Sequence, residues 1–501
     1  MKNAFALLLI LFSLTASAQI TFDLNGKINK KISSSLPEGA DVKLLKIYPA
    51  NGSEFPKVVV LRNGSEEEIT LRNLQNISFT PANIKEFWQD LGLKNGVYEN
   101  IAKEGLQYSL RSDLEDEALE FVDYVEGSDL GFNDAYLESY LHALIYRIYP
   151  LKLDDGRPGI LNVRVIKDFK PNAYILPNGS LFVTTGLLST IGSEEELIGI
   201  LAHEVAHFVL DHSVININEA VQRQKRAEFW AAFATVAAAA VDVYTSANGS
   251  NPAPGALTAG TAILSFGIAE TIRERMGLKF SREQEMQADD AAVELMKYIR
   301  VDPRALALTL AKIKTYSILS GNYLALTGAG THPAIEARIQ KIGEPPAFSN
   351  PQYDKTISFV NTFNAAVEFR KKHYQAATNL LQRNIDADLA TEEDYVLLAM
   401  TKMSMYDSDI RNLEALNLIR KAKELNVYPT LNIYKQEAIV LIRLAQLDKA
   451  KESLNKYLEI LNTEKTNLNA IKNERQFTNG TQFLNEEREW TLKMINKVDK
   501  F

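Results

Sequence analysis

The chain contains no cysteine among its 501 residues, so it has neither a disulfide framework nor a cysteine that could carry a lipid. Its stability must therefore come from hydrophobic cores, and its length predicts several domains. The formal net charge is −8 and the sequence lacks basic tracts, which argues against nucleic acid as a partner. Histidine is also scarce, with 6 residues in the whole chain.

Long apolar runs are equally rare, and the first of them lies at the N-terminus. Residues 1–18, MKNAFALLLILFSLTASA, combine one lysine, a short apolar run and a final Ala-Ser-Ala. This pattern predicts a secretory signal peptide, because a membrane anchor needs about 20 apolar residues. We therefore expect an exported protein that is soluble after cleavage.

The rest of the chain divides by its patterning. Residues 19–80 predict a small β-rich antiparallel module, because short β-rich runs alternate with Asn-Gly turns. Residues 81–345 are mostly helical in pattern, with strands expected between Leu161 and Thr185. A Pro-, Gly- and Ser-rich linker precedes a helical region at 353–501. The predicted fold class is mainly α (α+β).

Three helices in the C-terminal region begin alike, around Ala376, Ala415 and Ala450. Their spacings of 39 and 35 residues are close to the repeat of about 34 that is typical of tetratricopeptide repeats. A plain helical bundle would place its Ala and Leu residues similarly and stays open as the alternative.

Half of the histidines lie in the segment LAHEVAHFVLDH. Ser193 followed by Glu196 is a capping-box pattern, which predicts that a helix begins just before this segment. On that helix His203 and His207, four residues apart, point the same way and can share one cation. Glu204 is rotated about 100° around the helix axis from His203, so its carboxylate can contact a water molecule bound to the cation. The alternative is an ordinary helix that carries histidines.

A third protein ligand would separate these alternatives, because catalytic zinc takes three and leaves one position for water. The pattern HExxHxxGxxH fails here, since Leu210 and Ser213 stand where Gly and His are required. A ligand histidine commonly has a supporting carboxylate, and among the glutamates tested only Glu285 is followed by an aspartate, Asp289, four residues later. A second capping box beginning at Ser281 predicts that both are helical.

Three motifs, NAYILPNGSLFVTTGLLSTIGSEEELIGILAHEVAHFVLDH, SREQEMQAD and THPAIEARI, occur in that order over roughly a third of the chain. Together they resemble the zinc metallopeptidases that include HtpX and the CAAX prenyl proteases, in particular soluble exported members with tetratricopeptide repeats. The resemblance implies a zincin-type core and one Zn²⁺ per chain. It implies His203, His207 and Glu285 as ligands, Glu204 as general base and Asp289 as the supporting carboxylate.

The same resemblance implies roles for His332 and Arg338 near the reacting carbonyl. Both side chains would suit an oxyanion that develops beside the metal. Alternatively, His332 could bind the metal reversibly as a fourth ligand and keep the enzyme latent, or the segment Thr-His-Pro could merely cap a helix. His212 also matches the family, but nothing in its spacing makes it a ligand.

Two further segments bear on substrates. Residues 174–176 and 180–185 predict a hairpin whose edge could pair with an extended peptide, although a plain hairpin that covers the core is an equal alternative. Asn178 lies in a glycosylation sequon of this hairpin, and a glycan there would obstruct the edge, which favours a bacterial periplasm. The apolar runs 229–241 and 256–269 are too short to span a bilayer and predict helices that are either buried or interfacial. If they are interfacial, the protein makes peripheral contact with a membrane.

The function expected from these patterns is that of an exported zinc metalloendopeptidase in the quality control of misfolded or envelope proteins. Its substrates would be polypeptides, and its helical repeats would recruit protein partners. The alternative is a zinc-binding, chaperone-like protein whose proteolysis is gated or lost. The enzyme is favoured, because no catalytic position is missing.

Overall fold

The computed structural model describes residues 20–48, 56–101, 106–128, 130–157, 159, 161–223, 278–319, 335–345, 350–425, 431–468 and 474–500. Several predictions concern residues outside these ranges: the signal peptide at 1–18, the apolar runs at 229–241 and 256–269, and His332.

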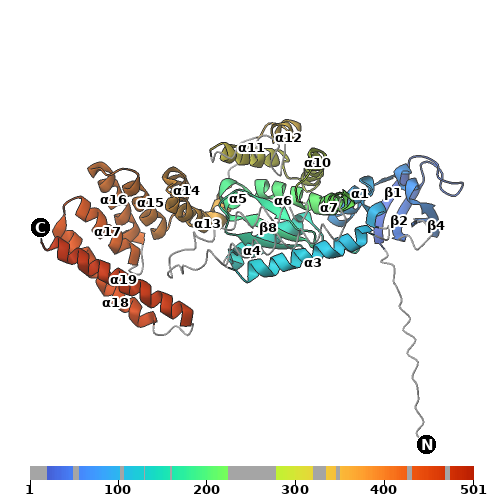
Figure 1. The fold of residues 1–501 in the computed structure, drawn as a ribbon. Helices are drawn as coiled ribbons and strands as arrows, with labels where there is room; N and C mark the ends of the chain where they lie inside the picture. Colours follow the sequence, from blue (N-terminus) through green and yellow to red (C-terminus); the bar gives the residue numbers. More distant parts are fainter. Residues whose placement is uncertain are drawn as a thin grey trace, which may run out of the picture.

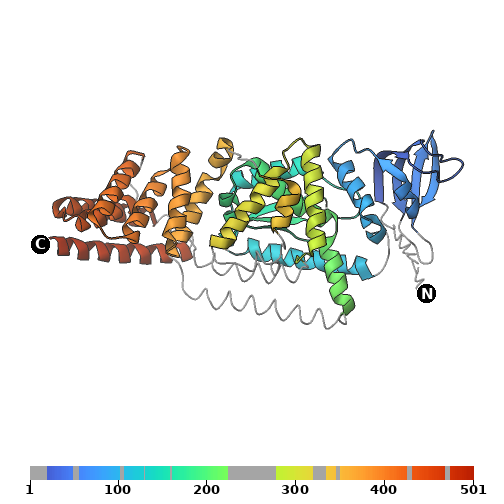
Figure 2. The ribbon, with the colours of Figure 1, turned by 90° about the horizontal axis from the view of Figure 1, so that it is seen from above.

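The described parts follow one another along an elongated molecule, with a β-sheet at one end, a mixed domain in the middle and helices at the other end (Figure 1). The view from above shows the same order (Figure 2). The N-terminal part consists of β1 (Ile20–Ile28), β2 (Asp41–Tyr48), β3 (Lys57–Arg62), β4 (Ser65–Thr70), the 3-10 helix η1 (Leu71–Asn76) and β5 (Ile77–Phe79).

The five N-terminal strands form one antiparallel sheet in the order β4-β3-β2-β1-β5, which confirms the predicted β-rich region. Its apolar face is buried, with Leu24, Leu44 and Val58 fully enclosed. Asn63 and Gly64 both have positive φ, 48° and 82°, and connect β3 to β4. A two-residue turn with both φ positive matches the twist of a hairpin, which explains the Asn-Gly pair.

Buried hydrogen bonds join this sheet to the central domain. The side-chain amide of Gln89, which is fully buried in α1 (Ile84–Lys94), donates to the backbone oxygens of Thr21 and Leu153 at 2.9 Å each. The backbone N–H of Thr21 also donates to the Asp154 oxygen at 3.1 Å. One amide thus links the first strand to a loop of the central domain.

The central domain is mainly helical and surrounds a short mixed sheet. Strands β6 (Asn162–Ile166) and β8 (Ser180–Thr184) run parallel, whereas β7 (Ala173–Ile175) pairs antiparallel with β8. The sheet order is β6-β8-β7, so the predicted strands between residues 161 and 185 are confirmed. The other elements are α2 (Val97–Ile101), α3 (Leu106–Glu126), α4 (Ala135–Ile148), α5 (Thr185–Thr190), α6 (Glu194–Val209), α7 (His212–Arg223), α10 (Arg282–Tyr298), α11 (Arg304–Leu319) and α12 (Ile335–Ile342).

Helix α6 lies at the centre of this domain and is surrounded by protein. Every residue from Glu196 to Val209 is buried, and α4, α7, α10, α11 and strand β7 all pack against the helix. Gly199 permits the close approach of α11, because a Cβ at this position would lie 3.1 Å from the Cβ of Leu306. A helix that is buried on all sides can hold functional side chains rigidly.

The C-terminal region consists of α13 (Pro351–Arg370), α14 (Tyr374–Asp386), α15 (Glu392–Met405), α16 (Asp409–Leu425), α17 (Leu431–Arg443), α18 (Leu447–Leu468) and α19 (Glu474–Val498). Each of these helices packs against the next along the chain. Ala415 and Ala450, which mark two of the predicted repeats, are fully buried, and in the first of them the buried alanine is Ala377, next to Ala376. Helices that pack in chain order agree with an α-hairpin array, and the tetratricopeptide type stays a prediction.

The first of these helices is docked firmly on the central domain. Ile357 and Val360 of α13 belong to the same hydrophobic core as α6. The Tyr353 hydroxyl donates to the Leu188 oxygen at 2.8 Å, and the Asn364 amide donates to the Thr185 oxygen at 2.7 Å. Helix α13 therefore attaches the C-terminal helical region to helix α5 of the central domain.

Within the described residues, no single helix has the length and apolar composition of a membrane span. Helices α6 and α7, which meet at a 45° bend, satisfy that test only as a pair.

We predict that Asn364→Ala lowers the midpoint of thermal unfolding. The substitution removes the hydrogen bonds from its amide to the Thr185 oxygen and the Ser189 hydroxyl, and each group left unpaired in a buried interface costs about 1–3 kcal/mol. Gln352→Ala removes an exposed amide from the same helix and serves as the control. Equal midpoints for the two variants would contradict the docking role of Asn364.

Candidate metal centre

The two histidines of the HExxH segment lie on the inner part of α6. The helix begins as expected, since the Ser193 side chain accepts a hydrogen bond from the Glu196 N–H at 3.2 Å. The Glu196 carboxylate accepts from the Gly192 N–H at 2.9 Å and pairs with Lys312 at 2.8 Å, so this capping arrangement differs from the predicted box. Three turns further on, His203 and His207 are both buried.

Glu285 reaches the same place from α10. This helix begins with a complete capping box, because the Ser281 N–H donates to Gln284 Oε1 at 2.8 Å and the Gln284 N–H donates to Ser281 Oγ at 3.2 Å. Helix α10 packs along α6, and its buried alanines allow close contact. Glu285, one residue beyond the box, is fully buried against the two histidines.

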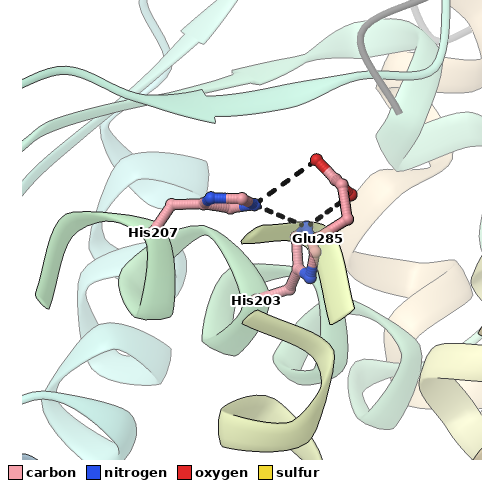
Figure 3. A group of neighbouring side chains, drawn as sticks. All are labelled: His203, His207 and Glu285. Atoms are coloured by element: carbon pink, nitrogen blue, oxygen red, sulfur yellow. Dashed lines mark hydrogen bonds and ion pairs between the residues drawn. The ribbon is translucent and has the colours of Figure 1, made fainter. Parts of the chain in front are cut away.

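The three side chains converge on one small space (Figure 3). Nε2 of His203 lies 3.1 Å from Nε2 of His207, and each of these nitrogens lies 3.6 Å from a Glu285 oxygen. A tetrahedral ion with bonds of about 2.0–2.1 Å holds its donors roughly 3.3–3.4 Å apart, so these separations fit such an ion. Among the described residues, this is the group of donors that could hold a metal.

Asp289 and Arg338 support the His203 side of the centre. The Asp289 carboxylate lies 2.9 Å from His203 Nδ1, one turn of α10 beyond Glu285. Arg338 from α12 donates to both Asp289 oxygens, at 2.7 and 2.8 Å, and pairs with Glu285 at 2.7 Å. Burial opposes ionisation of Asp289, but the Arg338 charge and the His203 hydrogen bond hold its pKa well below the usual range.

The pKa values of His203 and Arg338 are shifted by the same two influences, burial and the neighbouring carboxylates. Burial alone would lower the pKa of His203, but the hydrogen bond to Asp289 and the negative charges of Asp289 and Glu285 together raise it. Burial would likewise lower the pKa of Arg338, whereas the carboxylates of Asp289, Glu285 and Glu204 raise it. The guanidinium therefore stays charged inside the protein and holds two of these carboxylates.

The charges at the centre suit a dication. With neutral imidazoles and ionised carboxyls, Glu204, Glu285, Asp289 and Arg338 together carry two negative charges, and all four side chains are at most 2% exposed. Uncompensated buried charge is costly, whereas a divalent cation would neutralise it. Two nitrogen donors and one carboxylate are a ligand set that zinc commonly takes in catalytic sites.

Most of the residues expected at the site are present, and their roles stay predictions. Glu204 is buried beside His203 on α6, as its place in the helix requires. The Arg338 guanidinium contacts the carboxylates of Asp289 and Glu285, and its expected role near the reacting carbonyl stays a prediction. His332 lies outside the described residues.

His212 contacts the centre although its spacing did not indicate any role. Its Nδ1 lies 2.8 Å from Nδ1 of His207, and its Nε2 lies 3.1 Å from Oε1 of Gln287. Phe280 stacks on the His207 ring at a centroid distance of 3.7 Å. Burial lowers the pKa of His212 to about 4. Two signals were present in the sequence, the match of His212 to the family and its position five residues after a ligand histidine, and neither indicated this contact.

The end of α6 is held by a buried cluster that sequence reasoning missed entirely. The Arg157 guanidinium, 1% exposed, donates to the Val209 oxygen at 2.5 Å and to both Asp155 and the Phe208 oxygen. Asp211 adopts a left-handed conformation with φ of 60° and pairs with Arg111. These contacts satisfy the last carbonyls of the helix and fix the turn that carries His212.

We predict that Asp289→Asn weakens metal binding by about 10–100-fold, because the variant loses the carboxylate that orients His203 and pairs with Arg338. The measurement is the metal affinity of the full chain in competition with a chelator. Asp290→Asn changes the neighbouring exposed carboxylate and should leave the affinity unchanged. Equal affinities for both variants would refute the orienting role.

Comparison with known proteins agrees with this geometry. The model of peptidase family M48 matches residues 134–345. Mitochondrial metalloendopeptidase OMA1 of Schizosaccharomyces pombe is 28% identical over 247 residues, which cover 48% of this chain and 65% of that protein. A protease HtpX homolog of Methylibium petroleiphilum is 31% identical over 206 residues, covering 36% of this chain and 66% of the relative.

Metalloprotease YcaL of Escherichia coli is 26% identical over 188 residues, covering 38% of this chain and 62% of that protein. This chain thus spans less than two thirds of the length of each of these three relatives. The family match includes His203, His207, Glu285 and Arg338 and begins within the central domain, just before α4. Residues 134–345 therefore form a domain of peptidase family M48.

Proposed function

We propose that this chain is a zinc-dependent endopeptidase. The observation that carries the proposal is the convergence of His203, His207 and Glu285 on one buried point, with Glu204 on the same helix as the histidines. The relatives named metalloendopeptidase or metalloprotease support it, and the match to the model of peptidase family M48 contains all four residues. The donor set supports zinc as the metal.

A zinc ion at this point would supply Lewis acidity and lower the pKa of water next to it. The residues of the chain provide the rest of the chemistry. Asp289 accepts the His203 Nδ1 hydrogen, so the lone pair of the neutral ring lies on Nε2, the nitrogen that faces the centre. Glu204 is the group to take a proton from the attacking water and pass it to the leaving amine. Arg338 pairs with the carboxylates of Glu285 and Asp289 and stabilises their ionised forms in the buried site.

Strand β7 is the sheet edge at which we place an extended polypeptide substrate. Its pairing with β8 uses the backbone groups of residues 172, 174 and 176, so those of Ala173 and Ile175 face the other side of the strand. β7 also packs against α6, the helix that carries the histidines. Ala173 and Ile175 are only 3% and 2% exposed, so a substrate must displace what covers this edge before it binds there through its backbone, a mode that tolerates many side-chain sequences.

We further propose that the protein is exported, most simply to a bacterial periplasm, and degrades misfolded or envelope proteins there. The N-terminal sequence supports export, and the absence of cysteine is compatible with an oxidising compartment. The helices from α13 onward support recruitment of protein partners, because they form a long surface fixed beside the central domain. Peripheral membrane contact belongs to the same proposal and rests on the two apolar runs in the sequence.

We predict that Glu204→Gln abolishes cleavage of unfolded casein while the protein still binds one zinc ion. The amide cannot accept the proton from water, whereas the three ligands remain. Glu195→Gln, on the same helix but in its first turn, should cleave casein at the wild-type rate. A chelator should stop the wild type, and added zinc should restore it.

Equal digestion by wild type and Glu204→Gln would contradict the proposal, since the activity would then come from a contaminant. Stoichiometric zinc without any cleavage by the wild type would instead favour the chaperone-like alternative. Co-purification of bound polypeptides with the Glu204→Gln variant in the native host identifies the substrates, and recovery of folded cytoplasmic proteins alone would refute the quality-control role.

A further inference from the structure

His212 is the first residue of α7 and connects a metal-binding histidine to the protein surface. Its Nδ1 contacts Nδ1 of His207 at 2.8 Å, and its Nε2 contacts Oε1 of Gln287 at 3.1 Å. His212 is 1% exposed, whereas Gln287 is exposed on α10. Three side chains from α6, α7 and α10 thus form a continuous row of hydrogen-bonding groups.

The chemistry of this row fixes where the hydrogens lie. An amide oxygen only accepts, so Nε2 of His212 must donate to Gln287. A neutral imidazole carries one N–H, so Nδ1 of His212 is then an acceptor and His207 must donate to it from Nδ1. His207 consequently keeps its lone pair on Nε2, which is the nitrogen that faces His203 and Glu285. A metal ligand requires this tautomer.

The opposite polarity would be incompatible with metal binding. If His212 donated to His207, the hydrogen of His207 would sit on Nε2, within 3.1 Å of Nε2 of His203. That hydrogen would occupy the space between the two donors. A hydrogen-bond acceptor at Gln287 therefore favours, through His212, the tautomer of His207 that can bind a metal.

The row is held in place by rigid surroundings. Phe280 stacks on the His207 ring with an interplanar angle of 15°, which restricts rotation of the imidazole. The turn before His212 is fixed by the contacts of Arg157 with the last carbonyls of α6 and of Arg111 with Asp211. The position of His212 is thus determined by the fold and not by the metal.

We propose that His212 is a positioning residue that sets the tautomer and the orientation of His207, and that Gln287 is the acceptor that fixes its polarity. His212 is not a ligand, because both of its ring nitrogens are engaged by protein groups. The two ligand histidines are then supported differently, His203 by a charged carboxylate and His207 by a neutral row. This inference rests on the proposed zinc site.

The test is the zinc affinity of the full chain, measured in competition with a chromogenic chelator. His212→Leu should weaken the affinity about 10–100-fold, since the acceptor for His207 is lost. His212→Asn should stay within a few-fold of the wild type, because its amide oxygen can accept the same hydrogen. Zinc-free unfolding midpoints are measured alongside, since a merely structural role would change them and leave the affinity alone.

Gln287→Leu tests the outer end of the row without disturbing the core, because Gln287 is exposed. The site adjoins a cavity of about 290 Å³ that His212 and Gln287 help to line. Leucine is preferred to alanine because its bulk keeps water from taking the place of the amide oxygen. The variant should weaken zinc binding measurably, up to about 10-fold. Glu294→Leu, exposed on the same helix, is the matched control and should bind zinc as the wild type does.

Wild-type affinity in a folded His212→Leu protein overturns the proposal, and so does a failure of His212→Asn to recover binding. If His212→Leu does not fold, Gln287→Leu decides: a selective loss relative to Glu294→Leu supports the row, and equal affinity overturns it. These outcomes differ from a failure of the proposed function, in which the wild type itself would bind no stoichiometric zinc.

Discussion

The packing of α10 against α6 is the contact on which the site depends. It brings Glu285 to two histidines that precede it by about eighty residues in the sequence, and it places Asp289 beside His203 one turn later. Buried alanines on α10 allow the two backbones to approach closely. A bulkier residue on this face would separate the donors, and a ligand set that is spread by even an ångström no longer fits one ion.

Buried arginines paired with carboxylates surround this contact. Arg338 holds Asp289 and Glu285, while Arg157 holds the carbonyls at the end of α6. Each of these guanidiniums is almost fully buried, and each is paired with carboxylates, as buried charge requires. The result is a centre whose donors are oriented before a metal arrives, which is the arrangement that catalysis benefits from most.

The parts of the site that follow from local rules could be predicted from the sequence. A pair of histidines at i and i+4 on a capped helix is a local pattern, and so is Glu285 with a carboxylate one turn later. The contact of His212 with His207, the Arg157 cluster and the parallel pairing of β6 with β8 could not be predicted. They depend on which elements meet in three dimensions, and neither periodicity nor capping residues carry that information. The docking of α13 on the core was missed for the same reason, because a Pro-rich segment before it resembled a free linker.

The most direct test of the account is a crystal structure of the full chain grown with zinc, with anomalous data collected at the zinc absorption edge. The account predicts one strong anomalous peak, about 2.0–2.2 Å from Nε2 of His203, Nε2 of His207 and one Glu285 oxygen. A zinc-replete crystal in which no peak lies between the imidazoles, or in which the Glu285 carboxylate turns away from it, would contradict the central claim.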